Sequence, residues 1–242
     1  MRVEGRAVRK RFGRVEALRG VDFTIPSGGK VGLIGPNASG KSTLIRIILG
    51  LLRCEGELLL DGASKRDTEH AARIAYVPQI APKFGASVGE VIRAITRVRD
   101  MSPDDVVACG AEVGIDLRSV ERQAFRNLSG GAKQKTLISL ALASQASLYV
   151  LDEPTASLDT QSRGDLFQLL SERTADATLI LCSHRLEEIR TLVDRVMVLE
   201  EGRLAYFGPT EDYLDRMTLS TIDVQMKNGA DASVLEKMGF QQ

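Results

Sequence analysis

Residues 35–43 constrain the fold of this 242-residue chain more than any other segment. They read Gly-Pro-Asn-Ala-Ser-Gly-Lys-Ser-Thr, which matches the phosphate-binding pattern GxxxxGK[ST]. The apolar run 30–34 predicts a buried strand before the loop, and 42–49 predicts a helix after it, ended by Gly50. Because strand, glycine loop and helix are the context that the pattern requires, a glycine-rich turn that merely connects two elements is the weaker interpretation.

The loop is expected to cradle the phosphates of a nucleotide. Glycine lets the backbone approach phosphate oxygens, and the N-terminus of the following helix favours anions. Lys41 is expected to reach the β and γ phosphates, and the Ser42 hydroxyl to bind Mg²⁺, which prefers oxygen ligands. The predicted binding residues in this loop are Gly35, Pro36, Asn37, Ala38, Ser39, Gly40, Lys41, Ser42 and Thr43.

Two carboxylates follow a second apolar run. Residues 148–151 are all apolar, and Asp152 and Glu153 come directly after them. We expect Asp152 to hold Mg²⁺ through water and Glu153 to act as the general base that polarises the attacking water. Many ordinary strands also end in an acidic residue, so the pair gains its meaning from the phosphate loop earlier in the chain.

Composition limits the class of protein. The hydrophobic content of 43% supports a real core, in one large α/β domain or in a domain with an inserted subdomain. Lysine plus arginine and aspartate plus glutamate number 32 each, so no global charge favours nucleic acid or an anionic membrane. A role on DNA or RNA is therefore disfavoured unless a local basic patch supports it.

Cysteine usage and hydropathy point to a reduced, cytosolic setting. Cys54, Cys109 and Cys182 lie far apart with no CxxC spacing, so we expect small core hydrophobes. The sequence shows neither a signal-peptide pattern nor a run approaching the ~20 apolar residues that cross a bilayer. Any connection to a membrane is expected to come through a partner.

The remaining segments predict an α/β fold with flanking pieces. Residues 3–25, with turn signals at Phe12-Gly13 and Arg19-Gly20, and residues 56–61 predict an antiparallel sheet. Residues 86–114 have helical spacing, and Ser102 is expected to cap a helix with Pro103 in its first turn. This block is interpreted as a helical subdomain over about 83–130, inserted into a parallel-sheet core.

Parallel strands covered on both faces are predicted at 148–151 and 178–181, because both runs are nearly all apolar. A hairpin is expected where 195–199 turns at Glu201-Gly202 into 203–207. The core domain is assigned to 1–218 and a short accessory segment to 219–242, with a candidate strand at 221–226 and a candidate helix at 233–238.

Residues 127–134, Asn-Leu-Ser-Gly-Gly-Ala-Lys-Gln, resemble the signature motif of the ATP-binding-cassette (ABC) ATPase family. Together with the phosphate loop and the acidic pair, the resemblance covers 3–209 in the family's order. It implies a P-loop NTPase core that binds ATP. It also implies a head-to-tail dimer, in which Ser129, Gly130 and Gly131 of one subunit contact the γ-phosphate held by the other.

Four further positions resemble motifs of the same family. Gln79 in Tyr-Val-Pro-Gln is similar to the Q-loop glutamine, which senses the γ-phosphate and Mg²⁺ and contacts the membrane partner. Asp159 is similar to the D-loop aspartate, which crosses the dimer interface. His184, after the strand 178–181, resembles the switch histidine that contacts the γ-phosphate. Phe12 matches the aromatic position that stacks on adenine.

The resemblance implies an ATP hydrolase subunit of a membrane transporter of bacterial exporter type. Two identical chains and separate permease subunits are expected, with the ATPase at the inner, cytoplasmic face of the cell membrane. Residues 77–80 and 129–135 are similar to the ATPases of nitrous-oxide reductase maturation. Two alternatives stay open: a soluble ABC ATPase acting on nucleic acid or the ribosome, and a nucleotide-binding regulator, which Glu153 disfavours.

Overall fold

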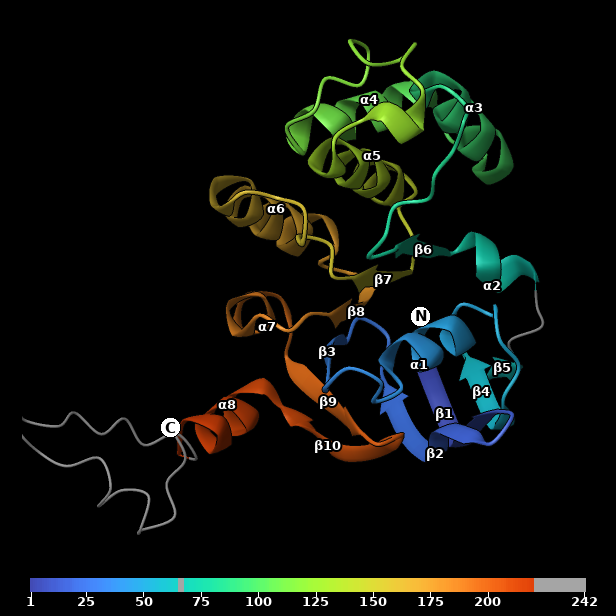
Figure 1. Cartoon of the computed structure of the whole chain (residues 1–242), viewed down its shortest axis with the longest axis vertical. Helices are drawn as coiled ribbons and strands as arrows, with labels where there is room; N and C mark the ends of the chain where they lie inside the picture. Colours follow the sequence, from blue (N-terminus) through green and yellow to red (C-terminus); the bar gives the residue numbers. More distant parts are fainter. Residues whose placement is uncertain (65–67, 220–242) are drawn as a thin grey trace, which may run out of the picture. The chain divides into compact units, whose positions relative to one another are not determined.

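The computed structural model describes residues 1–64 and 68–219 of the chain (Figure 1). The chain divides into two compact units, 1–210 and 211–242. Most of helix α8 (Thr210–Leu219) belongs to the second unit, and the strand and helix predicted at 221–226 and 233–238 lie outside the described residues. No helix in the described ranges is long and apolar enough to span a bilayer.

A six-stranded sheet forms the centre of the first unit, in the order β10-β9-β3-β8-β7-β6. All neighbours are parallel except β10 and β9, which form the predicted hairpin. Every residue of β7 and β8 is buried, as expected for parallel strands covered on both faces. The strands are β3 (Lys30–Ile34), β6 (Ile74–Val77), β7 (Leu148–Asp152), β8 (Thr178–Cys182), β9 (Arg195–Glu200) and β10 (Arg203–Pro209).

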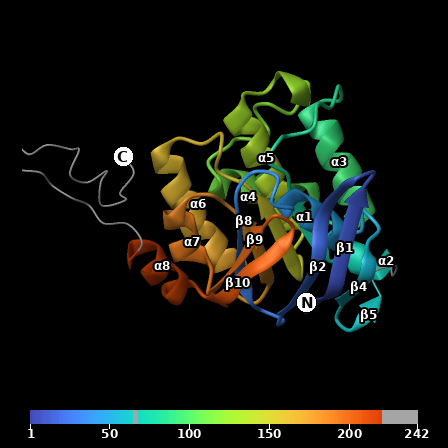
Figure 2. The same ribbon diagram turned by 60° about the horizontal axis from the view of Figure 1, so that its bottom comes forward.

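A second, antiparallel sheet has the order β2-β1-β4-β5, and Figure 2 shows β2 and β1 side by side. The predicted turn after Phe12 is confirmed. The turn predicted at Arg19-Gly20 is wrong, because β2 runs straight through it. Val8 pairs with Val21 and Arg9 with Arg19, so Gly20, at φ +85°, is an extra residue in a bulge. The strands are β1 (Val3–Phe12), β2 (Val15–Ile25), β4 (Glu55–Leu60) and β5 (Ala63–Ser64).

Helix α1 (Lys41–Ile48) contributes to a core that the two sheets share. Its apolar side chains at 44, 45, 47 and 48 are buried in one cluster with residues of β1, β3, β4 and β7. The helix ends at the predicted place, since Gly50 adopts φ +80°, a conformation that glycine takes without steric cost. The phosphate loop is thus held between a central strand and a helix whose apolar face is buried.

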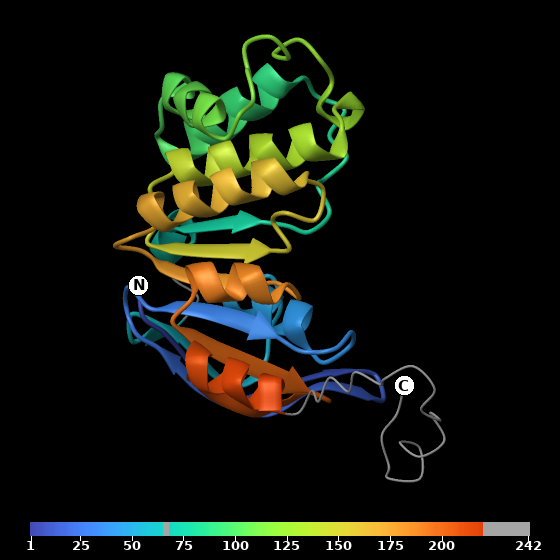
Figure 3. The same ribbon diagram turned by 90° about the vertical axis from the view of Figure 1, so that its left-hand side faces the viewer.

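The middle of the chain is helical, and Figure 3 shows these green and yellow-green segments gathered at one end of the first unit. Ser87 caps α3 in a capping box with Glu90, and Ser102 caps α4 as predicted. That this block is an inserted subdomain stays a prediction. The helices are α2 (Thr68–Ala72), α3 (Val88–Arg99), α4 (Pro103–Glu112), η1 (Phe125–Asn127), α5 (Gly130–Ala143), α6 (Thr160–Arg173) and α7 (Leu186–Leu192).

Candidate functional site

The chemistry-bearing residues meet at the carboxyl edge of the parallel sheet. The phosphate loop follows β3, Gln79 follows β6, Asp152 ends β7, and His184 follows β8. These strands are parallel neighbours, so their carboxyl ends converge, and Asp152 pairs directly with Cys182. Ligands bind at this edge in open α/β sheets. Strand order therefore brings together residues that are up to about 150 positions apart in the sequence.

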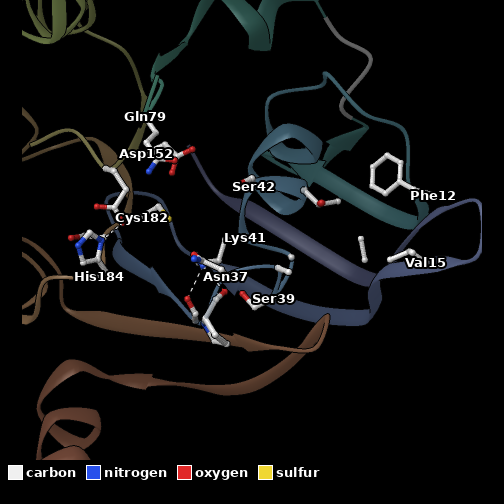
Figure 4. Close-up of a pocket in the computed structure, with 18 of the residues that line it drawn as sticks. Phe12, Val15, Asn37, Ser39, Lys41, Ser42, Gln79, Asp152, Cys182 and His184 are labelled. Carbon is white, nitrogen blue, oxygen red and sulfur yellow. Dashed lines mark hydrogen bonds and ion pairs between the residues drawn. The ribbon is translucent and has the colours of Figure 1, made fainter. Parts of the chain in front are cut away.

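A cleft of about 810 Å³ opens at this edge (Figure 4). In Figure 4, Phe12 and Val15 lie on one side of the labelled loop residues, and Cys182 and His184 lie on the other. The cleft is lined by residues 35–43 and by Phe12, Val15, Glu16, Ala17, Gln79, Asp152, Glu153, Cys182, Ser183 and His184.

The phosphate loop holds an unusual backbone. Ala38 adopts φ +65° and Gly40 φ +108°, so a residue with a side chain occupies the left-handed region. Lys41 Nζ donates hydrogen bonds to the carbonyl oxygens of Gly35 at 2.6 Å and Pro36 at 2.9 Å. The cation is therefore held inside the loop. Backbone strain of this kind is tolerated where the surroundings over-determine it, which is typical of ligand-binding loops.

The loop also presents hydrogen-bonding groups that have no partner. The Ser39 hydroxyl is buried and makes no hydrogen bond to the part of the chain that the structure describes. Gly40, the N-cap of α1, offers no side-chain cap, so no side chain there satisfies the first backbone N–H groups of the helix, whose residues 41–43 line the cleft. A tetrahedral anion with several oxygen acceptors fits this set of donors, because the helix N-terminus also carries partial positive charge.

Asp152 is a buried acid whose environment disfavours its charge. Burial raises the pKa of its carboxyl above the ordinary value, while a hydrogen bond from the Cys182 thiol and the positive charge of Lys41 act in the opposite direction. Burial also raises the pKa of Cys182, and the adjacent carboxylate adds to the increase. Cys182 is therefore a neutral thiol that lines the cleft rather than a nucleophile.

Replacing Asp152 with asparagine is expected to raise the Tm of the ligand-free protein at neutral pH. Folding raises the pKa of the Asp152 carboxyl, so at a pH between its unfolded and folded pKa values the folded state binds a proton that the unfolded chain has released. The free energy of unfolding therefore falls as the pH rises from the unfolded to the folded pKa, and the whole loss is present at any higher pH. Asparagine removes this cost, and each kcal/mol gained corresponds to about 2–4 °C in a chain of this size. Calorimetry in EDTA would measure it, and a lower or unchanged Tm would contradict the assignment.

Glu153 and His184, which both line the cleft, form a direct pair. The Glu153 backbone adopts φ +49°, and its N–H donates to the Cys182 carbonyl oxygen at 2.9 Å, which fixes the residue beyond the end of β7. His184 Nδ1 lies 2.8 Å from Glu153 Oε1, a hydrogen-bonding distance. The Glu153 carboxylate is nearly buried, whereas the imidazole is 72% exposed. A carboxyl group and an imidazole are thus in contact within the lining of the cleft.

Four of the predicted binding residues lie outside this cleft. Ser129, Gly130, Gly131 and Asp159 are not among its lining residues. Gly130 and Gly131 begin α5 and approach residues 157–158 of the same chain, and the Ser129 side chain caps the helix by accepting from the Ala132 N–H. Asp159 caps α6 in the same way. Within one chain, the signature segment and the phosphate loop are therefore not brought together.

The cleft has lining residues that the sequence did not reveal. Val15 pairs with Phe12 across the β1–β2 hairpin, so it reaches the cleft on the same side. Glu16 and Ala17 follow it along β2. Only the strand pairing indicates this, since the three residues carry no motif of their own. Cys182, expected to be a small core hydrophobe, is buried as predicted but also faces the cleft.

The fold and this cleft define a P-loop nucleotide-binding protein. The family profile described as ABC transporter matches residues 18–156. The zinc uptake system ATP-binding protein ZurA of Listeria monocytogenes is 32% identical over 87% of this chain and 87% of its own length. The manganese transport system ATP-binding protein MntB of Bacillus subtilis is 31% identical over 81% of each chain. The chain belongs to the ABC transporter family.

Solved structures agree with this family. A bacterial Atm1-family ABC exporter with ATP bound superimposes with a TM-score of 0.81 and 28% identity, covering 93% of this chain and 42% of that one. An ATP-binding subunit of an ABC transporter superimposes with a TM-score of 0.79 at 24% identity and supports the fold. The predicted fold class and the resemblance to ABC ATPases are confirmed: this is an ATP-binding, ATP-hydrolysing subunit of the ABC type.

Proposed function

We propose that this chain is the ATPase subunit of a membrane transporter of exporter type, in which two copies bind ATP between them. The observation that carries the proposal is the separation of the signature segment from the cleft. Ser129 and Gly130 are exposed at the start of α5, away from their own phosphate loop. A serine hydroxyl and glycine amides at a helix start suit a phosphate, and a second copy in head-to-tail arrangement would bring one to them.

Hydrolysis then proceeds by in-line attack of water on the γ-phosphorus. The Glu153 carboxylate orients the water and accepts its proton, a P–O bond forms to the water oxygen, and the bond to the bridging oxygen breaks to release ADP. Lys41 and His184 stabilise the charge on the γ-phosphoryl oxygens, together with Ser129 of the second copy. Closure and reopening of the paired subunits would couple ATP hydrolysis to movement of the permease.

Mg²⁺ suits the oxygen donors of this cleft. Ser42 contributes a hydroxyl, Gln79 an amide oxygen and Asp152 a carboxylate, and all three residues line the same space. Hard cations prefer such ligands, and Mg²⁺ keeps several waters, so few protein groups are needed. When bound, the ion would neutralise charge on the β and γ phosphates. Mg²⁺ therefore fits this cleft because three oxygen-bearing side chains line the same space.

Phe12 is proposed to stack on the adenine ring. Its side chain is 47% exposed on the cleft wall, with Lys10 Nζ at 5.3 Å from the ring centroid. Phe12→Ala is expected to raise the Kd for ATP about tenfold, because base–aromatic stacking contributes about 1–3 kcal/mol. Isothermal titration with ATP measures it, and inorganic tripolyphosphate, which has no base, should bind both proteins equally.

The matched control for that experiment is Leu51→Ala. Leu51 is another exposed apolar side chain, but it does not line the cleft. It should leave ATP binding unchanged. Equal Kd values for Phe12→Ala and the wild type would show that the ring does not contact the base.

The partner is proposed to be a separate permease that contacts the segment after Gln79. Ile80 is 79% exposed and Phe84 40% exposed, which suits an apolar contact surface beside the cleft. The subunit would then be held peripherally at the inner face of the cell membrane.

We assign the ATPase domain to 1–218 and a C-terminal accessory segment to 219–242. Relatives of this chain include ATP-binding proteins named for import. The proposed direction, export, is therefore supported by the resemblance of residues 77–80 and 129–135 to exporter ATPases.

Purification of the tagged Glu153→Gln chain from detergent-solubilised membranes with ATP tests the partner. Mass spectrometry should identify a multi-spanning protein that is absent when ADP replaces ATP or when the tag is omitted. Recovery of ribosomal proteins or nucleic acid without such a protein would contradict the proposal and favour the soluble alternative. The balanced charge already disfavours that alternative, because a net charge of zero creates no global attraction for nucleic acid.

A further inference from the structure

A buried carboxylate joins the two loops that carry Glu153 and His184. Glu188, in helix α7, is 1% exposed. One of its oxygens, Oε1, accepts a hydrogen bond from the Thr155 hydroxyl. The other, Oε2, accepts from the Ser183 hydroxyl at 2.6 Å. Both hydroxyls are buried as well, so this is a closed polar network inside the protein.

The network holds the backbone on both sides of His184. Ser183 precedes the histidine, and its Oγ also accepts a hydrogen bond from the Arg185 N–H at 3.1 Å. Arg185 follows the histidine, and its Nε lies 3.7 Å from Glu188 Oε1. The imidazole itself is 72% exposed, so packing contributes little to its position. The backbone that Glu188 fixes on either side therefore sets where the ring begins, and the contact with Glu153 Oε1 sets where Nδ1 points.

The same carboxylate reaches the loop that follows Glu153. Thr155 comes two residues after Glu153, and its carbonyl oxygen accepts from the Leu158 N–H at 3.0 Å. Glu188 therefore links the loop 153–159 to the loop 183–185. These loops present the Glu153–His184 pair, whose atoms are 2.8 Å apart.

Packing alone does not explain a buried carboxyl group at this place. Burying a polar group costs free energy, and a well-packed apolar residue of similar volume is often equal or better for stability. Two hydroxyls and one guanidinium meet this carboxylate, and all three belong to the two loops of the cleft. We propose that Glu188 is a positioning residue for ATP hydrolysis, which holds the Glu153 and His184 loops in register; this rests on the function proposed for that pair.

Steady-state kinetics of Glu188→Ala test the proposal. We expect kcat to fall about tenfold or more, because a misplacement of about 1 Å at the reacting groups can cost 10²-fold. KM for ATP should change little, since Glu188 does not line the cleft. Glu188→Gln can still bond both hydroxyls and should recover part of the loss. Glu187→Ala removes an exposed glutamate from the same helix and should match the wild type.

A second readout does not depend on turnover. The chain has two histidines, His70 and His184, so the ring ¹H–¹⁵N signals of the labelled protein are few and can be assigned with a His70→Gln variant. Glu188→Ala should shift or broaden the His184 signals and leave those of His70 unchanged. If Glu188→Ala does not fold, Thr155→Val, which removes one hydroxyl and keeps the shape, should give the same changes to a smaller extent.

Each outcome decides the matter. Unchanged His184 signals, a wild-type kcat, or a rise in KM at constant kcat would each overturn the positioning role. Failure of the proposed function is recognised separately: Glu153→Gln would then hydrolyse ATP normally. In that case the histidine signals still show whether Glu188 holds the loop.

Discussion

Glu153→Gln should lower the rate of ATP hydrolysis by about 10²–10⁴-fold, the usual contribution of a general base. Glutamine keeps the shape of the side chain and can still bond His184 Nδ1, which lies 2.8 Å from Oε1 in the wild type. It cannot accept the proton of the attacking water. Because the phosphate loop is untouched, Kd for ATP should stay close to the wild-type value. Phosphate release at saturating ATP measures the first quantity and isothermal titration the second.

Glu201→Gln is the matched control. Glu201 also adopts a left-handed backbone, at φ +46°, but it is exposed in the turn between β9 and β10 and does not line the cleft. The same chemical change there should leave hydrolysis unaltered. If Glu153→Gln hydrolysed ATP at the wild-type rate, Glu153 would have no role as the base.

Lys41→Ala should act at an earlier stage, on binding as well as on turnover. Its ammonium group is held by the carbonyl oxygens of Gly35 and Pro36, and Lys41 lines the cleft beside the phosphate loop. Removing it takes a full positive charge from the site proposed for the β and γ phosphates. We expect kcat/KM to fall by about 10²–10³-fold, as for loss of a preorganised donor to developing charge. The measurement is the initial rate across a range of ATP concentrations.

Two further variants separate charge from geometry. Lys41→Arg keeps the charge but replaces a compact ammonium with a planar fork, so it should also lose most of the activity. Lys30→Ala removes a lysine from the strand before the loop, where Nζ donates to the Thr174 carbonyl oxygen at 3.2 Å, outside the cleft. It should keep its activity. Normal ATP affinity in Lys41→Ala would contradict the role of Lys41.

Local patterns predicted most of the fold because the elements carry their own signals. Strand β3 and the two fully buried, nearly all apolar strands β7 and β8 appear where the runs predict them. Arg19-Gly20 was misinterpreted because glycine marks bulges as well as turns, and only the register of β1 against β2 distinguishes the two.

The sequence predicted the motif residues of the site, but it did not predict the side-chain contacts that support them. The phosphate loop, Asp152, Glu153 and His184 each stand at a strand end, so the sequence indicated that they meet. Glu188 could not be recognised in this way. It lies in an ordinary amphipathic helix beside Glu187, and only the fold shows that one of the two is buried against Thr155 and Ser183. Long-range hydrogen bonds of this kind have no local pattern.

An ATP site completed by a second copy is tested most directly by the molar mass of the Glu153→Gln chain in solution, measured by light scattering with ATP and Mg²⁺. We expect twice the 26.3 kDa of one chain, because Ser129, Gly130 and Gly131 of each copy would close the cleft of the other. With ADP, the mass should return to that of one chain. A single-chain mass while ATP is demonstrably bound would show that the cleft is not completed by a second copy.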